Sequence, residues 1–258
     1  MEFLSLLPIL TAGLAVGLIS TIFGIGGGIL MVPLLTAITP LTQVEAMATS
    51  LTTVVMITSW NTWRYHRQGL VIWKVAGMVV LGSAICSAIA AYIATFLPEK
   101  LLVGFMLGFL LFLAWKTFGI REIKPGDKPA GPVAAFGIGA LCGTIAGLVG
   151  IGGGSITTPL LLVSGLVKNR TAAPTSNAIM VCTAGAGALT YAFRGPFAWP
   201  HLGLVQLDYS LLMAAGAITS SFIGMRINSR IALSRRRAIL GLILLLISIR
   251  LAFQLLYS

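Results

Sequence analysis

The sequence predicts an all-α, polytopic membrane protein built from two inverted-topology repeats. Three observations predict it. The 258-residue chain is 57% hydrophobic and only 9% charged, whereas soluble domains carry about 25% charged residues. A glycine-rich stretch occurs twice, 126 residues apart. Lysines and arginines gather between the apolar segments, in a pattern that places equivalent loops of the two copies on opposite sides of a membrane.

The two copies align at a constant offset of 126 residues without gaps. The stretch 24–28 reads Gly-Ile-Gly-Gly-Gly with Pro-Leu-Leu at 33–35, and both recur at 150–154 and 159–161. Over residues 13–51, 14 of 39 positions are identical to the residue 126 positions later. Composition alone does not align a glycine cluster, a proline and a Thr-Ser pair, so we interpret this as an internal duplication. The predicted organisation is a first repeat at 1–119, a cytoplasmic linker at 120–132 and a second, inverted repeat at 133–258.

Each repeat is predicted to begin with a broken helical hairpin, at 3–38 and at 133–165. A straight helix over 3–38 would be about 54 Å long, against a hydrocarbon core of about 30 Å. One interpretation of the glycines is close packing between membrane helices. The other is a helix break, because a run of glycines admits positive φ. A duplicated triple glycine with a proline five residues on favours the break, with new helices beginning near Gly28 and Gly154.

Three plain transmembrane helices are predicted to follow each hairpin. In the first repeat they fall at 46–64, 71–96 and 101–118, and in the second at 171–193, 208–226 and 238–257. Hydropathy alone gives eight spans. The number of helical elements rises to ten if each hairpin contains two helices.

Charge predicts the orientation. Fourteen of the 17 lysines and arginines fall within 64–74, 116–128, 168–170 and 226–237. Placing these stretches in the cytoplasm leaves only Lys100, Arg194 and Arg250 toward the other side. Equivalent loops then lie on opposite faces, so the repeats are inverted, and each hairpin must enter and leave on one face. We expect the hairpin at 3–38 to enter from outside, and both termini to lie on the outer face.

This plan is typical of secondary transporters. Inverted repeats with broken helices usually hold the substrate near the midplane of the membrane, between the repeats. One half rocking against the other would expose that site to each side in turn. A helix that begins at a break offers unpaired N–H groups and a positive dipole end, which bind anions.

The candidate substrate-binding residues are the two glycine-rich tips and the polar residues that follow each hairpin. Hydroxyls there have an alternative role as helix caps or in interhelical hydrogen bonds. We expect Pro174 in the first turn of its helix, which would leave the N–H groups of 175–177 free. The candidates are Gly26, Gly27, Gly28, Ile29, Thr49, Ser50 and Thr53, with Gly152, Gly153, Gly154, Ser155, Thr175, Ser176 and Asn177 in the second half.

Two further groups carry other interpretations. Trp60, Trp63 and Tyr65 lie beside Arg64 and Arg67, which is typical of the aromatic belt at a membrane interface. Arg250, in the last span, either snorkels to the interface or lines the anion pathway.

The sequence also argues against several classes of function. Its three cysteines stand singly in apolar segments and indicate neither a disulfide framework nor a metal site. Ser155 follows glycines, but no histidine or lysine is expected near it as a base, so we predict no catalytic residues. Nucleotide-binding motifs are missing, which argues against direct ATP drive and a nucleotide cofactor. The basic residues are explained by orientation rather than by nucleic-acid binding. The expected partners are a small anion and the lipid bilayer.

The duplicated G-x-G-G-G-x-x-x-x-P-x-L pattern, in a chain of this length with a basic linker, resembles the TauE/SafE-type sulfite exporters. These are also called the toluene-sulfonate uptake permease family. The resemblance covers nearly the whole chain. It implies a multi-pass carrier of sulfite, sulfonates or related organosulfur anions in a bacterial inner membrane. Alternatives that the sequence leaves open are a carrier of another small anion, such as a carboxylate, and a channel.

Overall fold

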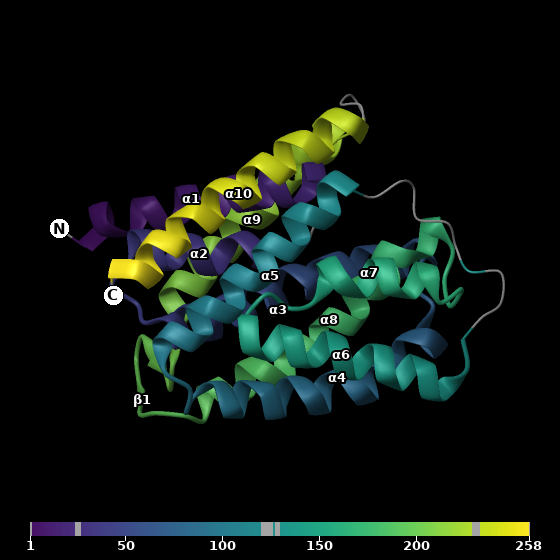
Figure 1. Ribbon diagram of the computed structural model, residues 1–258, viewed down its shortest axis with the longest axis horizontal. Helices are drawn as coiled ribbons and strands as arrows, with labels where there is room; N and C mark the ends of the chain where they lie inside the picture. The colour runs from purple at the N-terminus through teal and green to yellow at the C-terminus, as the bar shows by residue number, and fades with distance from the viewer. Residues whose placement is uncertain (1, 24–26, 120–125, 127–129, 229–232, 258) are drawn as a thin grey trace.

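The computed structural model describes residues 2–23, 27–119, 126, 130–228 and 233–257 (Figure 1). Across these residues the chain forms ten α-helices and three two-residue strands. The helices are α1 Glu2–Phe23, α2 Gly28–Ile38, α3 Gln43–Arg67, α4 Trp73–Ala94, α5 Glu99–Gly119, α6 Pro132–Val149, α7 Gly154–Val163, α8 Asn169–Ala192, α9 Leu207–Asn228 and α10 Leu233–Tyr257. The predicted all-helical architecture is confirmed.

The second helix of each hairpin begins at the end of its glycine run. These helix starts are at Gly28 and at Gly154, the positions expected from the sequence. At the second break, Gly150, Gly152 and Gly153 have φ angles of 74°, 70° and 83°. This left-handed region disfavours every residue with a Cβ, so the backbone itself requires glycine there. The first break, at 24–26, lies outside the described residues.

The two hairpins open toward opposite ends of the bundle (Figure 1). α1 begins and α10 ends at one end, which we call the terminal end. The α2–α3 and α4–α5 connections and the three strands lie there too. The α3–α4 and α7–α8 connections lie at the opposite end, which we call the linker end.

Five helices, α4, α5, α6, α9 and α10, are long and apolar enough to cross a membrane. The described parts of α1, α2 and α7 are shorter apolar helices. The two remaining helices, α3 and α8, are more polar, begin at equivalent positions and pack on each other. Because many of their hydroxyl side chains are buried, including Thr49, Ser50, Thr175 and Ser176, this central pair is where buried polar chemistry is available.

Glycines bring α1 against α9, and α6 against α4, at equivalent places. A Cβ added at Gly13 would meet the backbone of Met213, and one at Gly139 would meet the backbone of Val79. Gly13 and Gly139 are 126 positions apart, whereas Val79 and Met213 are 134 apart, because the chain before α9 is eight residues longer than that before α4. We call such pairs of residues counterparts: they are 126 positions apart up to the extra residues, and 134 positions apart after them. Each close pair joins one helix from each half of the sequence, so the packing units are not the two halves.

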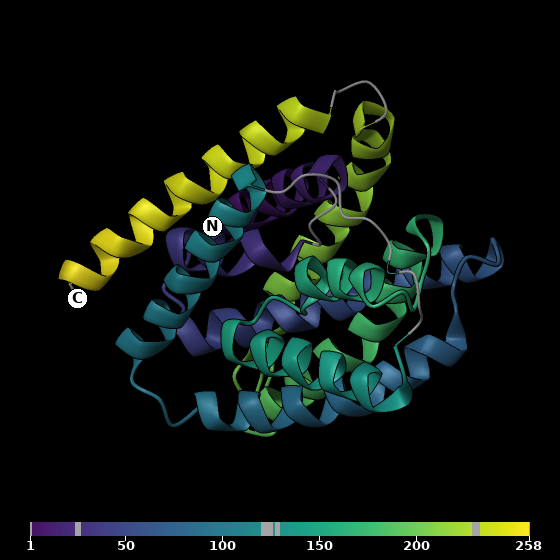
Figure 2. The ribbon, with the colours of Figure 1, turned by 45° about the vertical axis from the view of Figure 1, so that its right-hand side comes forward.

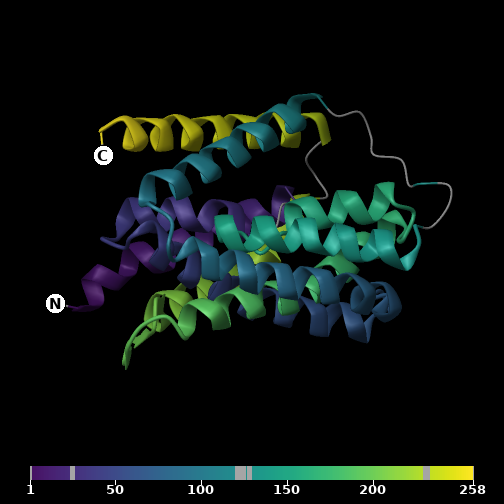
Figure 3. The same ribbon diagram turned by 60° about the horizontal axis from the view of Figure 1, so that its bottom comes forward.

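The extra residues before α9 form a small antiparallel sheet, which the sequence did not lead us to expect. Its order is β1 (Phe197–Ala198), β2 (His201–Leu202), β3 (Val205–Gln206). His201 pairs with Ala198 on one side and with Gln206 on the other. The last strand leads directly into α9. Away from the centre, α5 and α10 pack on each other at the edge of the bundle (Figures 2 and 3).

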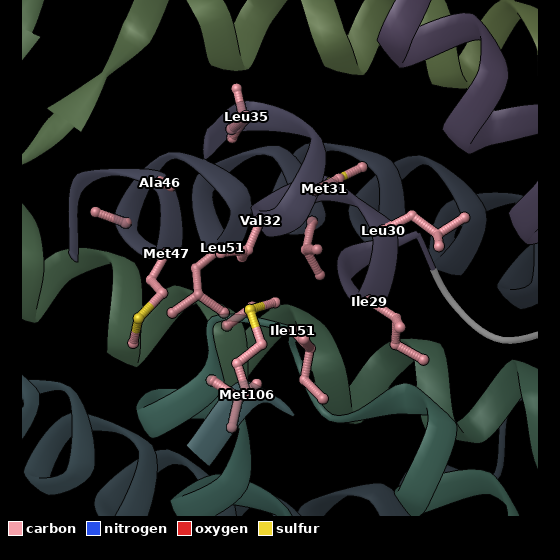
Figure 4. Close-up of a cluster of buried hydrophobic side chains, with 14 of the residues drawn as sticks. Ile29, Leu30, Met31, Val32, Leu35, Ala46, Met47, Leu51, Met106 and Ile151 are labelled. Atoms are coloured by element: carbon pink, nitrogen blue, oxygen red, sulfur yellow. The ribbon is translucent and has the colours of Figure 1, made fainter. Parts of the chain in front are cut away.

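The largest apolar cluster joins the first hairpin to the centre of the molecule. Val32 of α2 lies toward Leu51 of α3 (Figure 4), and Leu35 and Met47 are buried in the same cluster. Ile151 of the second break belongs to the same cluster. This apolar core therefore ties α2, α3 and the second break together at the centre of the molecule.

Candidate functional site

A cavity of about 410 Å³ lies between the two helix breaks. Its walls come from α1, α3, α8 and α9, and both glycine tips reach it. The lining reaches Gln68 at the end of α3, so the cavity extends toward the linker end. Its polar lining residues are Ser20, Thr21, Thr58, Asn61, Arg64, Tyr65, Gln68, Thr158, Ser176, Asn177 and Ser221.

The tips touch each other beside this cavity. Gly27, the N-cap of α2, and Gly154, the first residue of α7, both line it. A methyl group added at Gly28 would collide with the carbonyl group of Ile151. The first N–H groups of a helix have no partner within the helix, and the positive end of the dipole lies there. Two helix starts therefore converge on one space.

One wall of the cavity is a polar stripe on α3. Thr58, Asn61, Arg64, Tyr65 and Gln68 recur at the three- and four-residue spacing that places side chains on one helix face. Arg64 is the cation of the wall, and the described lining residues include no carboxylate. Its guanidinium carbon lies 5.1 Å from the ring centre of Phe222.

Sequence reasoning missed this stripe. It assigned Arg64 and Tyr65 to an aromatic belt at the membrane interface, because tryptophans lie beside them. The signal that identifies them was the helical spacing of polar residues from 58 to 68. Trp60 and Trp63 are exposed and do not line the cavity, so for these two residues the aromatic belt stays a prediction.

Four of the predicted site residues line the cavity: Gly27, Gly154, Ser176 and Asn177. The Asn177 amide donates to the Ala173 carbonyl at 2.8 Å, and its oxygen accepts from the Asn61 amide at 3.4 Å. The Ser176 hydroxyl is buried, and the described residues provide it with no hydrogen-bond partner. An amide pair and an unpartnered hydroxyl therefore face the space between the tips.

Ser50, the counterpart of Ser176, has a different environment. Its hydroxyl donates a 2.8 Å hydrogen bond to the carbonyl of Gly150, the residue that ends α6 in the left-handed conformation. Thr53 donates to the Thr49 carbonyl within α3 at 2.8 Å. Ser50 therefore makes a hydrogen bond to another segment and Thr53 makes one within its own helix, which is the structural role that the sequence offered as the alternative to substrate binding.

Thr49 and Thr175 have identical structural roles. The Thr49 hydroxyl oxygen accepts from the N–H of Gln206, and the Thr175 hydroxyl oxygen accepts from the N–H of Ile72, both at 3.1 Å. Gln206 and Ile72 each precede the first residue of a helix, α9 and α4. Each threonine therefore fixes the start of a helix that belongs to the other half of the chain.

The remaining candidates that the structure describes do not line the cavity. Ile29 is 1% exposed in the apolar core. Gly152 packs on Val54, and Gly153 is the N-cap of α7. The Ser155 hydroxyl has no hydrogen-bond partner among the residues described. Gly26 falls outside them.

The expectation for Pro174 was wrong. α8 begins at Asn169, so Pro174 stands inside the helix and the N–H groups of 175–177 follow its first turn. The helix begins early because its first turn is capped locally: the N–H of Lys168 donates to the Thr171 hydroxyl, and the N–H of Thr171 donates back to the Lys168 carbonyl. The Pro174 side chain is buried.

Arg250 binds the end of α2. Its two Nη atoms donate to the carbonyls of Pro33, at 2.7 Å, and Thr36, at 3.4 Å. Cations are favourable near helix C-termini, and Thr36 stands in the last turn of α2. Arg250 does not line the cavity, and its contact with backbone carbonyls differs from simple snorkelling. Instead it ties α10 to the first hairpin.

Comparison with known proteins gives a consistent set of matches. The family described as Sulfite exporter TauE/SafE matches residues 9–251. A probable membrane transporter protein of Methanocaldococcus jannaschii is 29% identical over 94% of both chains. One of Haemophilus influenzae is 28% identical over 96% of both. The probable membrane transporter protein YunE of Bacillus subtilis is 26% identical over 99% of this chain and 100% of its own. No solved structure gives a significant match.

Proposed function

The chain belongs to the sulfite exporter TauE/SafE family, and from this premise we propose that it is a secondary transporter of small organosulfur anions such as sulfite and sulfonates. The observation that carries the proposal is the cavity that both helix starts share. Its described lining offers an arginine, amides and hydroxyls, and no carboxylate.

This lining suits a compact oxyanion. Sulfite and sulfonate groups present three oxygens that accept hydrogen bonds. Arg64 supplies a fixed positive charge and a planar set of donors, Ser176 and Asn177 supply neutral donors, and the starts of α2 and α7 supply positive potential. The volume leaves room for the anion together with water. Neutral donors with a single cation favour binding that is weak enough for release.

We assign the anion to the space between the tips, and its passage to alternating access. The support is the set of counterpart contacts: α1 with α9 and α6 with α4 pack through equivalent glycines, and Thr49 and Thr175 fix equivalent helix starts. This is the relation expected of inverted-topology repeats. Because each close pair joins both halves of the sequence, the units that move are the α1–α9 pair and the α4–α6 pair, rather than residues 1–119 against 133–258.

We place the protein in the inner membrane with both termini outside. The described basic residues Arg64, Arg67, Lys74, Lys168 and Arg170 come from the α3–α4 and α7–α8 regions at the linker end, and the positive-inside rule assigns that end to the cytoplasm. On this assignment the cavity opens to the cytoplasm.

The test is uptake of radiolabelled sulfite, and separately of methanesulfonate, into liposomes containing the purified protein. We expect saturable uptake that the other of the two anions inhibits. Thermal stabilisation of the detergent-purified protein by the same anions should follow, since a ligand that binds the folded state raises its apparent stability. Uptake of acetate or phosphate with none of sulfite or methanesulfonate would overturn the choice of cargo. Flux that does not saturate would overturn the carrier in favour of a channel.

A further inference from the structure

We propose that the chain holds a second vestibule for the same anion at the terminal end, closed in this structure, with Arg194 at its mouth. It is the counterpart of the open cavity and leads to the same glycine tips from the other side. This inference rests on the proposed function, because it supplies the second route that a carrier needs.

The first observation is a difference between counterpart walls. Ile57 and Asn61 of α3 line the open cavity opposite Ala217 and Ser221 of α9. Their counterparts are Thr183 and Gly187 of α8, and Ser83 and Ser87 of α4. These four positions border the open cavity between α3 and α9, so the contacts of their four counterparts show whether α8 and α4 leave an equivalent gap.

In the second place the gap is closed. The Thr183 hydroxyl donates to the Ser83 hydroxyl at 2.7 Å. A Cβ added at Gly187 would lie 2.9 Å from the Ser87 hydroxyl. α8 thus touches α4 where α3 and α9 are separated by the cavity, although the α1–α9 and α6–α4 pairs remain equally close.

The second observation is a buried hydroxyl without a hydrogen-bond partner, that of Ser87, where α4 contacts α8. Ser87 is 0% exposed, and none of the residues that the structure describes bonds to its hydroxyl. Buried hydroxyls without a partner are uncommon in folded proteins. Its counterpart Ser221 lines the open cavity. A serine at this position is explained if the wall that it belongs to becomes wet when the vestibule opens.

The third observation is a tyrosine that acts as a latch. Tyr65 lines the open cavity, whereas its counterpart Tyr191 is 0% exposed and donates to the carbonyl of Gly147 in α6 at 2.8 Å. The counterpart of Gly147, Thr21 of α1, lines the open cavity opposite Tyr65. Opening the second vestibule requires release of Tyr191 from Gly147 and of Thr183 from Ser83.

The fourth observation is the cation at the mouth. Arg194 is the counterpart of Gln68, which lines the open cavity at its outer limit. The guanidinium carbon of Arg194 lies 4.1 Å from the ring centre of Tyr92 and 4.6 Å from that of Phe96. Its Nε and Nη2 atoms are buried, and within the described ranges neither has a hydrogen-bond partner. Two unpartnered donors on a fixed cation match two oxygens of a sulfonate or sulfite.

The vestibule is tested first by accessibility, without transport. Ser87→Cys is introduced after Cys86, Cys142 and Cys182 are replaced by alanine, and the protein is reconstituted in one orientation. A membrane-impermeant methanethiosulfonate added at the terminal end should modify the introduced thiol. The modification should be at least tenfold slower when a disulfide between positions 83 and 183, described next, holds the vestibule closed. Lack of modification from that side, with and without methanesulfonate present, would overturn the vestibule.

The lock is a cysteine pair, Thr183→Cys with Ser83→Cys, in the same background. Oxidation should join them, because the two native oxygens are in contact. Methanesulfonate uptake should then fall at least tenfold and return on reduction, while thermal stabilisation by methanesulfonate persists through the open cavity. Sulfite is avoided because it cleaves disulfides. Full uptake in the cross-linked protein would overturn the proposal.

Arg194→Ala should raise the half-saturating methanesulfonate concentration for uptake from the terminal end about tenfold, and Arg194→Lys should restore part of it. Lys100→Ala, which removes an exposed charge from the same end, should change it less than twofold. Equal effects of the two alanine variants would remove Arg194 from the site. Thiol modification at the terminal end in a protein with no uptake would keep the vestibule and refute the cargo, so the two proposals fail separately.

Discussion

The Ser50 hydroxyl donates a 2.8 Å hydrogen bond to the carbonyl of Gly150, 100 residues away. Gly150 ends α6 in the left-handed conformation, and its carbonyl lies beside the second glycine break. The bond joins the central helix of the first half to the tip of the second hairpin. The counterpart of Ser50, Ser176, instead faces the cavity with an unpartnered hydroxyl.

This pair of serines makes the first prediction. Ser50→Ala should destabilise the protein by about 1–3 kcal/mol, because it leaves a buried carbonyl without a donor. Ser176→Ala removes no such bond, and should leave stability nearly unchanged while weakening anion binding severalfold. Thermal unfolding of the purified variants, with and without methanesulfonate, measures both effects. A larger loss of stability in Ser176→Ala would contradict these roles.

The second prediction concerns backbone conformation at the break. Gly152→Ala should lower stability by at least about 1–2 kcal/mol, since φ is 70° and a Cβ is strained in that region. The added methyl group would also meet Val54. Gly77→Ala in α4 is the matched control: nothing lies within 4 Å of the added Cβ, and alanine favours a helix by about 1 kcal/mol over glycine. We expect the unfolding midpoint to fall in Gly152→Ala and to rise in Gly77→Ala, relative to the wild type.

The third prediction separates two arginines one turn apart. Arg64→Ala should lower the affinity for sulfite about tenfold or more, because it removes the cation that lines the cavity. Arg67, whose guanidinium carbon lies 5.3 Å from the Trp63 ring centre, is not among the lining residues, so Arg67→Ala should change affinity less than twofold. Thermal shifts over a sulfite titration provide the comparison. Similar affinities for both variants would exclude Arg64 from binding.

The fourth prediction addresses orientation. Single cysteines introduced at Lys100 and at Lys168, in a cysteine-free background, should react with an impermeant maleimide from opposite faces of intact cells. Lys100 is predicted to react from outside, whereas Lys168 should react only after the membrane is permeabilised. Both positions are exposed, so access does not limit the reaction. Reaction of both from one face would refute the assigned topology.

The sequence by itself determined the number of helices of this protein, though not the small sheet before α9. The length of an apolar segment against the thickness of a bilayer, together with three glycines, placed helix starts at Gly28 and Gly154. These are properties of a short stretch of chain, so no knowledge of its neighbours was needed. Helix ends that depend on local capping were less well predicted, as the start of α8 at Asn169 shows.

Only the tertiary structure decided what the polar residues do. Ser50 and Ser176 occupy the same place in two copies of one motif, yet one is bonded and the other faces the cavity. Likewise Tyr65 lines open space while Tyr191 is latched. The physical reason is that equivalent positions of a duplicated sequence meet different neighbours in one packed conformation: Tyr65 lines a cavity, whereas Tyr191 meets the carbonyl of Gly147. Which side chain meets water and which meets a carbonyl is therefore a property of that conformation.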